Sequence, residues 1–498
     1  MTTQQALQKL AEYEKTNAAL GYASMVVYYD GATAAPKKSD DIRAESLGYL
    51  AGKGYELTTC PETVEMLETL NADIKNLDAV TARKVSELYR NYDRTRRIPA
   101  DEFVEFQMLT AKADAVWHDA KEKNDFSLFE PYLTRIFDGV KKIAGYTDPG
   151  KPTYDALLGN FERGLTTAQC DGFFATLRSR LIPLIKEISG VKQIDDTPLK
   201  QNFPVAVQRE FSDFIMGVMG IDRERCVIGE TEHPFTTGLT KNDVRITTHY
   251  HEDMVASSLY SVIHEGGHAL YELNIGDDIT ASSLGGGVSM AIHESQSRFY
   301  ENIIGRSREF CGVILPWLKE RFAPRLDGVS PDAFYKMINK SEPSLIRTEA
   351  DELTYCLHIM VRYELEKAVL GGDIAVKDLP GEWNRLYKEY LGIDVPDDRR
   401  GVLQDSHWSN ANIGYFPSYA IGSAYGAQYL VEMNKTVDVF GAVASGDLSP
   451  VNDWFREKIW KFGCMYDPDK LFASVCGDFD PNIYADYLND KFGDIYNI

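Results

Sequence analysis

The sequence predicts a mainly α-helical protein built around one large interior. Long stretches in the first third of the chain are laced with charge and place apolar residues at intervals of three and four, the spacing of an amphipathic helix. Strand patterns are scarce, and no repeat of fixed period indicates a solenoid. With 498 residues, 44% of them hydrophobic, the chain has ample apolar material for a folded core.

Helices are predicted where the apolar spacing runs unbroken. In the first third of the chain these segments are Gln4–Ala18, Pro61–Asn76, Ala79–Thr95, Ala100–Lys123 and Ser127–Lys142. Turn-rich stretches between periodic segments predict loops. They are Thr147–Thr153, Gly190–Pro204, Ile275–Val288 and Asp394–Gly401.

One short strand is predicted at Asp243–Tyr250. Val244, Ile246 and Thr247 are β-branched, and the segment follows a turn-like stretch. We expect this strand to form the edge of a small sheet directly before the next helix.

Charge and cysteine content exclude several classes of function. The chain has 53 basic and 75 acidic residues, a net charge of −22, and no local basic cluster for a phosphate backbone or an anionic membrane. No apolar run approaches the roughly 20 residues that span a bilayer, and the first twenty residues lack the apolar block of a secretory signal. We therefore expect a cytoplasmic protein without nucleic-acid or membrane partners. Seven scattered cysteines without a C-x-x-C pair argue against a disulfide framework or a thiolate zinc finger.

The segment Glu252–Asn274 carries the most informative motif. Its apolar residues recur with helical spacing, and it contains His-Glu-Gly-Gly-His from His264 to His268. Residues four apart project from one face of a helix, so both imidazoles are placed to bind a single Zn²⁺. Glu265 is then placed to hold a water at the metal without ligating the ion itself. The two central glycines weaken a helix, which is explained if another element packs closely there.

A catalytic zinc normally has three protein ligands and one open position, so a third ligand is expected on a neighbouring element. After three consecutive glycines at 285–287, Val288–Ile304 predicts a helix with His293 and Glu294 near its start. A carboxylate completes the His₂Glu set typical of zinc peptidases, and we therefore assign Glu294. His293 and Glu301 on the same helix are the alternatives.

Six short motifs follow one another along the chain. They are His233-Pro234-Phe235, Asp243-Val244-Arg245-Ile246-Thr247, the HExxH motif at 264–268, His293-Glu294-Ser295-Gln296, IRTEAD at 346–351 and GVLQDSHW at 401–408. In this order they resemble the signature set of the carboxypeptidase Taq family of metallocarboxypeptidases. The one departure is that Gln296 follows Ser295 directly, where the family pattern places one more residue. The two ends of the chain also look like that family's, so the resemblance spans nearly the whole sequence.

This resemblance implies a large, saddle-like helical fold around a deep groove, with only a very small β element before the HExxH helix. We expect a single catalytic domain over residues 1–498, in which about 1–230 form one wall of the groove and 231–498 hold the zinc site. The resemblance also implies a cytosolic homodimer that removes single amino acids from the C-terminus of peptides. Zn²⁺ is the expected cofactor, and Co²⁺ suits the same ligands.

The residues at the motifs suggest a mechanism. Glu265 is the predicted general base, which takes a proton from the zinc-activated water and passes it to the leaving amine. The oxyanion that forms needs a second donor beside the metal. We assign Tyr415 to this role because a phenol can donate while neutral, and His407 is the alternative.

An enzyme that removes only C-terminal residues must recognise a free carboxylate, which a guanidinium binds through two parallel hydrogen bonds. Arg347 is the predicted donor, and Arg245 is the runner-up. The remaining polar residues of the motifs are candidates for contacting substrate, orienting ligands or closing the groove: His233, Asp243, Gln404 and Asp405.

Two other functions stay open. A helical zinc oligopeptidase would cleave internal bonds of short peptides, and it would not need Arg347 or Arg245. A helical scaffold with a vestigial zinc site would have no use for Glu265, because a structural site closes its fourth position with protein.

Overall fold

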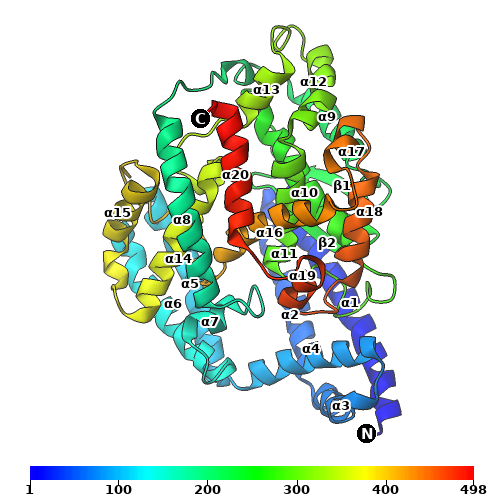
Figure 1. Ribbon diagram of the computed structural model, residues 1–498. Coiled ribbons are helices and arrows are strands. Elements are labelled where there is room, and N and C mark those ends of the chain that lie inside the picture. Colours follow the sequence, from blue (N-terminus) through cyan, green and yellow to red (C-terminus); the bar gives the residue numbers. More distant parts are fainter.

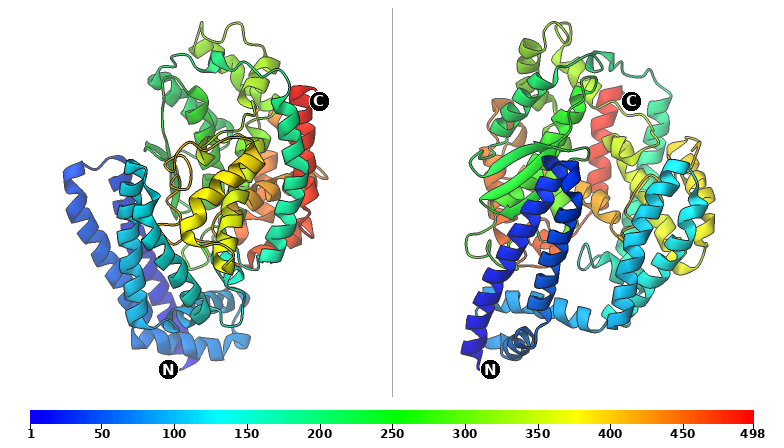
Figure 2. Two further views of the ribbon diagram at one scale, coloured as in Figure 1. Left: turned by 90° about the vertical axis from the view of Figure 1, so that its left-hand side faces the viewer. Right: turned by 180° about the vertical axis from the view of Figure 1, so that it is seen from behind.

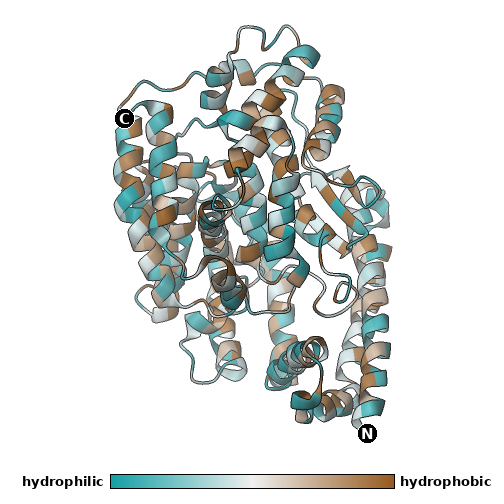
Figure 3. Ribbon diagram, turned by 45° about the vertical axis from the view of Figure 1, so that its right-hand side comes forward, coloured by the Kyte–Doolittle hydropathy of each residue, from teal (hydrophilic) through white to brown (hydrophobic).

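The computed structural model describes all residues 1–498 and confirms the mainly helical class (Figure 1). The chain forms twenty α-helices and one small sheet of three strands. None of these helices combines the length and the apolar character needed to cross a membrane. Outer helices carry both hydrophilic and hydrophobic residues along their length, as expected when one face of each packs on the interior (Figure 3).

The N-terminal helices form an arm beside the main body (Figure 2). They are α1 (Thr3–Thr33), α2 (Asp40–Thr59), α3 (Pro61–Ala72) and α4 (Ala79–Arg96). Helices α1, α3 and α4 share a small apolar core of their own, which includes Leu10, Met66 and Val85 and is separate from the main core. Helix α4 then runs across the base of the molecule toward the helices that follow.

The helices after α4 connect the N-terminal arm to the main body. They are α5 (Ala100–Lys123), α6 (Phe126–Thr147), α7 (Thr153–Leu158), α8 (Thr167–Ser189) and α9 (Val205–Val218). The helices predicted in the first third of the chain are all present. Helix α1 runs fifteen residues beyond its predicted end at Ala18, because its second half packs on α2 and strand β2.

The sheet consists of β1 (Cys226–Glu230), β2 (Thr236–Thr240) and β3 (Asp243–Thr248), in the order β1-β3-β2. Strand β3 runs parallel to β1 and antiparallel to β2. The predicted strand is therefore confirmed, but its placement at a sheet edge is wrong, because β3 is the central strand. Its neighbours escaped prediction since each is only five residues long and contains a glycine.

Four helices form the centre of the molecule. They are α10 (Val255–Leu273), α11 (Met290–Arg298), α14 (Glu352–Gly371) and α16 (Pro417–Met433). Helix α10 packs on β3, and α11 packs against both α10 and α16. The helix predicted at Val288–Ile304 begins two residues later and changes at Phe299–Ile304 into a π-helix, a rare form that often marks a functional site.

The remaining helices enclose this centre. They are α12 (Arg308–Arg321), α13 (Pro331–Ile338), α15 (Leu379–Leu391), α17 (Val439–Ser445), α18 (Ser449–Lys458), α19 (Pro468–Cys476) and α20 (Pro481–Tyr496). The last helix, α20, lies alongside α8, so the C-terminus packs on one of the first helices of the main body (Figure 1). Residues 392–416, between α15 and α16, form no helix or strand. This segment carries the last sequence motif.

Candidate metal centre

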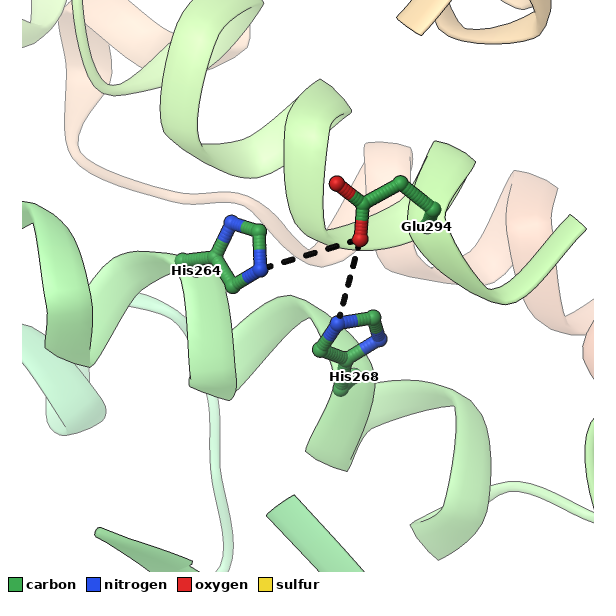
Figure 4. Close-up of side chains that lie close together, drawn as sticks. All are labelled: His264, His268 and Glu294. Atoms are coloured by element: carbon green, nitrogen blue, oxygen red, sulfur yellow. Dashed lines mark ion pairs between the residues drawn. The ribbon is translucent and has the colours of Figure 1, made fainter. Parts of the chain in front are cut away.

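Three potential ligands converge at the crossing of α10 and α11 (Figure 4). His264 and His268 lie on one face of α10, and Glu294 reaches them from α11. Glu294 Oε2 is 3.8 Å from Nε2 of His264 and 3.6 Å from Nε2 of His268, and the three ligand atoms all lie within 4.8 Å of one another. The structure thus brings together the three residues that the sequence predicts as metal ligands.

The close approach of the two helices depends on a glycine of the motif. A Cβ atom at Gly267 would lie 2.7 Å from the backbone oxygen of Gln296 and 2.7 Å from the Cα of Ser297. Backbone atoms cannot move aside easily, so a larger residue here would push α11 away from α10. The glycine that weakens the helix is therefore what allows Glu294 to reach the two imidazoles.

Of the three residues, His268 and Glu294 have protonation states that suit a cation. Burial opposes the charged form of His264, but Glu294 and Glu301 outweigh it and raise the pKa of this imidazole. Burial lowers the pKa of His268 to about 4, so this imidazole is neutral near pH 7. Burial opposes the ionisation of Glu294, but Arg298 and the two imidazoles outweigh it and hold the pKa of the carboxyl well below its usual range. Neutral imidazole and ionised carboxylate are the forms that bind divalent cations. Three acceptor atoms that face one point without a donor among them fit a metal ion.

Two of the ligands have a further partner that fixes their orientation. His264 donates from Nδ1 to Glu301 Oε2 at 2.9 Å, which leaves Nε2 facing the ligand point. Arg298 donates from Nε to Glu294 Oε1 at 2.7 Å and also contacts Glu301. Glu301, the alternative third ligand, thus orients His264 and lies outside the ligand group.

Glu265 lies beside the ligands but does not point at them as a fourth. Its side chain is only 7% exposed, and Oε2 accepts a hydrogen bond from the Thr236 hydroxyl of β2 at 2.5 Å. Burial raises the pKa of Glu265 above its usual value, although His264 and Thr236 offset part of the effect. Because Thr236 occupies one carboxylate oxygen, the other oxygen is left to exchange a proton.

Three further predicted residues, Arg347, Gln404 and Asp405, meet in what we call the arginine cluster. Its fourth member, Arg362 on α14, was not predicted from the sequence. Arg347 donates from Nε and Nη2 to Oδ1 of Asp405 at 3.0 and 2.9 Å. Arg362 donates from Nε to the other oxygen, Oδ2, at 2.7 Å. Gln404 accepts from Arg362 at 2.7 Å and from the backbone N–H of Arg347 at 3.0 Å. Asp405 is buried, but the two guanidinium groups outweigh that burial and hold its pKa far below the usual range.

Tyr415 and His407 lie together between the arginine cluster and α11. Their rings are 5.3 Å apart, and the Tyr415 hydroxyl is 3.7 Å from Met290 Sδ at the start of α11. Burial raises the pKa of Tyr415, so its phenol stays protonated. Burial, together with Arg347 and Arg362, lowers the pKa of His407 to about 4, so this imidazole is neutral, and its Nδ1 has no hydrogen-bond partner.

Tyr355 on α14 joins the arginine cluster to the metal centre. Its hydroxyl accepts from Arg347 Nη1 at 3.1 Å, and the guanidinium of Arg298 lies 4.2 Å from the centre of its ring. Arg298 in turn holds Glu294. Arg347 and Glu294 are therefore separated by only two side chains.

The predicted residues on the sheet do not join either group. Arg245 pairs with Asp243 at 2.8 Å and lies over the ring of Tyr29 on α1. His233 is exposed in the connection between β1 and β2. Asp243 also accepts a hydrogen bond from Tyr22 of α1, so these motif residues tie the N-terminal arm to the sheet.

Several residues of the site were not identified from the sequence. Arg298 stands four residues after Glu294, and Glu272 stands four after His268, so helical spacing was a usable signal for both. Thr236 offered no such signal, because it lies 29 residues before Glu265 on a different element. Tyr355 and Tyr419 stand within twelve residues of their partners Arg347 and His407, but they lie on other elements, so no helical spacing connects them. Only the packing of those elements places them here.

Known proteins resemble this chain over its whole length. Residues 9–492 match the family described as carboxypeptidase Taq (M32) metallopeptidase. Carboxypeptidase 1 of Bacillus subtilis is 38% identical over 477 residues, 95% of each chain. Thermostable carboxypeptidase 1 of Thermus thermophilus is 35% identical over 510 residues and covers both chains fully. The crystal structure of the M32 carboxypeptidase from Deinococcus radiodurans R1 has a TM-score of 0.96 and 32% identity, covering 99% of this chain and 100% of that one.

Proposed function

The chain belongs to the carboxypeptidase Taq (M32) family of metallopeptidases and is thus a peptide hydrolase, and from this premise we propose that it removes single amino acids from the C-terminus of peptides. His264, His268 and Glu294 hold the metal ion, and Glu265 is the general base. The observation that carries this proposal is the convergence of three acceptor atoms beside a buried carboxylate with one free oxygen.

Zinc is the metal that best suits two imidazoles and one carboxylate, and cobalt suits the same donors. When bound at these three atoms, such an ion supplies Lewis-acid chemistry, which polarises the scissile carbonyl and lowers the pKa of water.

Glu265 moves the proton. Thr236 donates to Oε2, so Oε1 accepts the proton of the attacking water and later delivers it to the leaving amine. Burial of this carboxyl raises its pKa, which makes the protonated form accessible during the transfer. The backbone oxygen of Glu265 also lies 3.0 Å from the Thr236 hydroxyl and shares its single proton, which keeps the hydroxyl next to the carboxylate.

Tyr415 donates a hydrogen bond to the oxyanion that develops on the scissile carbonyl. Its phenol is neutral and protonated, it lies next to α11, and no charged partner occupies its hydroxyl. The ring of His407 lies beside that of Tyr415, tilted by 44°, and its Nε2 forms a hydrogen bond with the Tyr419 hydroxyl at 3.2 Å. Its unpartnered Nδ1 orients the substrate.

Arg347 binds the free carboxylate of the substrate. A guanidinium has five N–H groups, and Arg347 gives two to Asp405 and one to Tyr355, so one N–H on each terminal nitrogen remains for a carboxylate. The link through Tyr355 and Arg298 places Arg347 near the metal centre. Arg245 is the weaker candidate because its Nε and Nη2 both bond Asp243, which lies on the sheet beside the N-terminal arm.

Two further parts of the proposal are a cytoplasmic location and a homodimer, and the homodimer rests on family resemblance alone. Sedimentation at several protein concentrations tests the dimer. A mass of one chain at all concentrations would contradict it.

Product analysis by mass spectrometry tests the activity. A peptide with a free C-terminus and the same peptide as its C-terminal amide are incubated with the zinc-loaded protein and with Glu265→Gln. Glu68→Gln, on the exposed face of α3, is the matched control. We expect stepwise loss of single residues from the free acid only, with both the parent and Glu68→Gln.

Internal cleavage of both peptides would indicate an oligopeptidase instead. If neither peptide were cleaved in a metal-dependent way, the peptidase assignment would be wrong.

A further inference from the structure

A second histidine contacts the ring nitrogen of His268 that does not face the metal site. Nδ1 of His268, on the side of the ring away from Glu294, lies 2.6 Å from Nδ1 of His293. The other nitrogen of His293, Nε2, lies 2.8 Å from Oε1 of Glu272. We propose that His293 and Glu272 form a relay that fixes the tautomer and the orientation of His268, and that they are positioning residues for the metal. This inference rests on the proposed ligand set.

The relay permits only one arrangement of protons for a neutral pair of imidazoles. The Glu272 carboxylate accepts hydrogen bonds, so His293 carries its proton on Nε2 and donates it to Glu272. Nδ1 of His293 is then an acceptor, and His268 must carry its own proton on Nδ1 to donate to it. Nε2 of His268 is left with a bare lone pair that faces Glu294 and the metal.

The reverse arrangement would disable the site. If His293 carried its proton on Nδ1 and donated to His268, the proton of His268 would move to Nε2. A protonated Nε2 cannot ligate a metal. Glu272 excludes this arrangement because its carboxylate offers no proton to Nε2 of His293.

The chain builds this relay from three separate features. Glu272 stands four residues after His268 on α10, so both lie on the same face of the helix. His293 is the neighbour of Glu294 on α11. The glycine-rich connection between the helices completes the relay, since the backbone N–H of Gly287 donates to the same Glu272 oxygen at 3.1 Å.

Gly287 also explains why that connection cannot carry a side chain here. A Cβ atom at this position would lie 2.3 Å from Cδ2 of the His293 ring. On its other side the ring lies 5.1 Å from the ring of Tyr271. The His293 ring is therefore confined between α10 and the connection, as expected of a group whose orientation matters.

The other histidine ligand reaches a carboxylate directly. His264 donates from Nδ1 to Glu301 at 2.9 Å with no residue between them. In both cases the chain of hydrogen bonds from Nδ1 of the ligand ends in a carboxylate and leaves Nε2 unprotonated. The chain that starts at His268 contains one additional imidazole, that of His293. Loss of such outer partners typically weakens metal binding by about 10 to 100-fold.

Zinc affinity, measured by competition with a chelator, tests the relay. His293→Phe keeps a ring of similar size without nitrogen, and Glu272→Met keeps the length of the side chain without an acceptor. Glu272→Gln is the conservative variant, because its amide oxygen can accept from both His293 and Gly287. His118→Phe, on the exposed surface of α5, is the control.

We expect the dissociation constant for zinc to rise about 10 to 100-fold in His293→Phe and Glu272→Met. The constants of Glu272→Gln and His118→Phe are expected to stay within about threefold of the parent. An unchanged constant in folded His293→Phe or Glu272→Met would overturn the relay. A loss of zinc affinity in Glu272→Gln as large as that in Glu272→Met would overturn it too, because the amide oxygen of Gln still accepts the hydrogen bond from His293.

The unmutated zinc-bound protein provides a second test that does not depend on how the variants fold. In spectra of ¹⁵N-labelled histidine, we expect a proton on Nδ1 of His268 and on Nε2 of His293, and none on Nδ1 of His293. A proton on Nδ1 of His293 would overturn the relay. These results are distinguishable from failure of the proposed function, because zinc binding with the expected tautomers but without peptidase activity would contradict only the function.

Discussion

The metal centre and the arginine cluster bury charge in the same helical core, but they arrange it in opposite ways. In the metal centre, three acceptor atoms face one another within 4.8 Å, and no donor lies among them. In the arginine cluster, both oxygens of Asp405 meet guanidinium N–H groups, and Gln404 fills further positions. Burial of charge is therefore common to both regions. The two regions differ in what their lone pairs face. In the metal centre they face one another and need a cation, whereas in the arginine cluster they face the guanidinium groups of Arg347 and Arg362.

This comparison predicts that variants in the two regions affect different properties. We expect residues around the ligand point to serve chemistry and to contribute little to folding. Residues of the arginine cluster compensate one another, so removing one partner leaves a buried charge behind. The four predictions below separate these effects.

Glu265→Gln has the largest expected effect. Loss of a general base typically costs about 10²- to 10⁴-fold in rate, and we expect kcat to fall by that factor. The amide still accepts from Thr236, so the thermal midpoint should stay within a few degrees of the parent. Steady-state kinetics and calorimetry on the zinc-loaded protein measure both. A large loss of stability would mean that Glu265 is structural.

Asp405→Asn reverses this pattern. The change keeps the size of the side chain but leaves Arg347 and Arg362 buried, at 6% and 0% exposure, without their carboxylate. Breaking a buried ion pair from one side costs about 3–5 kcal/mol, and urea denaturation should show a loss of this size. Asp213→Asn, whose carboxylate pairs with Arg223 at the surface at 3.2 Å, should cost less than about 1 kcal/mol. Equal losses would remove the distinction between the two regions.

Tyr415→Phe tests the boundary between the regions. The hydroxyl contacts Met290 Sδ at 3.7 Å and has no charged partner, so its loss should leave stability almost unchanged. Loss of one oxyanion donor costs about 10² to 10³ in kcat, and we expect the lower part of that range. An unchanged kcat would indicate that Tyr415 is not the oxyanion donor. His407 would then be the candidate, and His407→Phe would test it.

Glu366 on α14 represents a third arrangement and gives the smallest expected effect. It accepts from Tyr154, Trp408 and the backbone N–H of Gly414 at 2.7 to 2.8 Å. Burial outweighs these bonds and raises its pKa to about 7. The stability that this group contributes is full below its unfolded pKa of about 4.5 and is lost as the pH rises through 7.

Glu366→Gln lacks this titration. Between pH 5 and pH 8 the parent should therefore lose about 1–3 kcal/mol of stability relative to the variant, measured by urea denaturation at both values. Buried Glu162, whose pKa burial also raises to about 7, titrates in both proteins and cancels in the difference. A difference that does not change with pH would show that Glu366 is ionised throughout.

The sequence predicted the helices and the pairing of His264 with His268 because both depend on local spacing. Periodic apolar residues placed α4 and α5 with the correct first residue. The spacing of four between His264 and His268 placed both imidazoles on one face of α10. Strands β1 and β2 escaped prediction because a five-residue strand with a glycine has too little alternation to detect. The sheet position of β3 depends on those two strands, so it was predicted wrongly.

The residues that surround the site divide in the same way. Arg298 and Glu272 follow ligands by four residues and were within reach of sequence reasoning. Arg347 was recognised as a guanidinium of interest, but its partners Asp405 and Tyr355 lie 58 and 8 residues away. No spacing rule connects a turn before α14 with the irregular segment after α15.

The sequence by itself determined the helical class, the paired imidazoles and the carboxylate that follows the first of them. These features need only the 3.6-residue period of a helix, which acts within one segment. The tertiary structure alone decided which charges meet: Glu301 behind His264, His293 and Glu272 behind His268, Thr236 on Glu265, and Asp405 between two arginines. Such encounters depend on how whole elements pack, and close packing, as at Gly267, is a property of two segments at once.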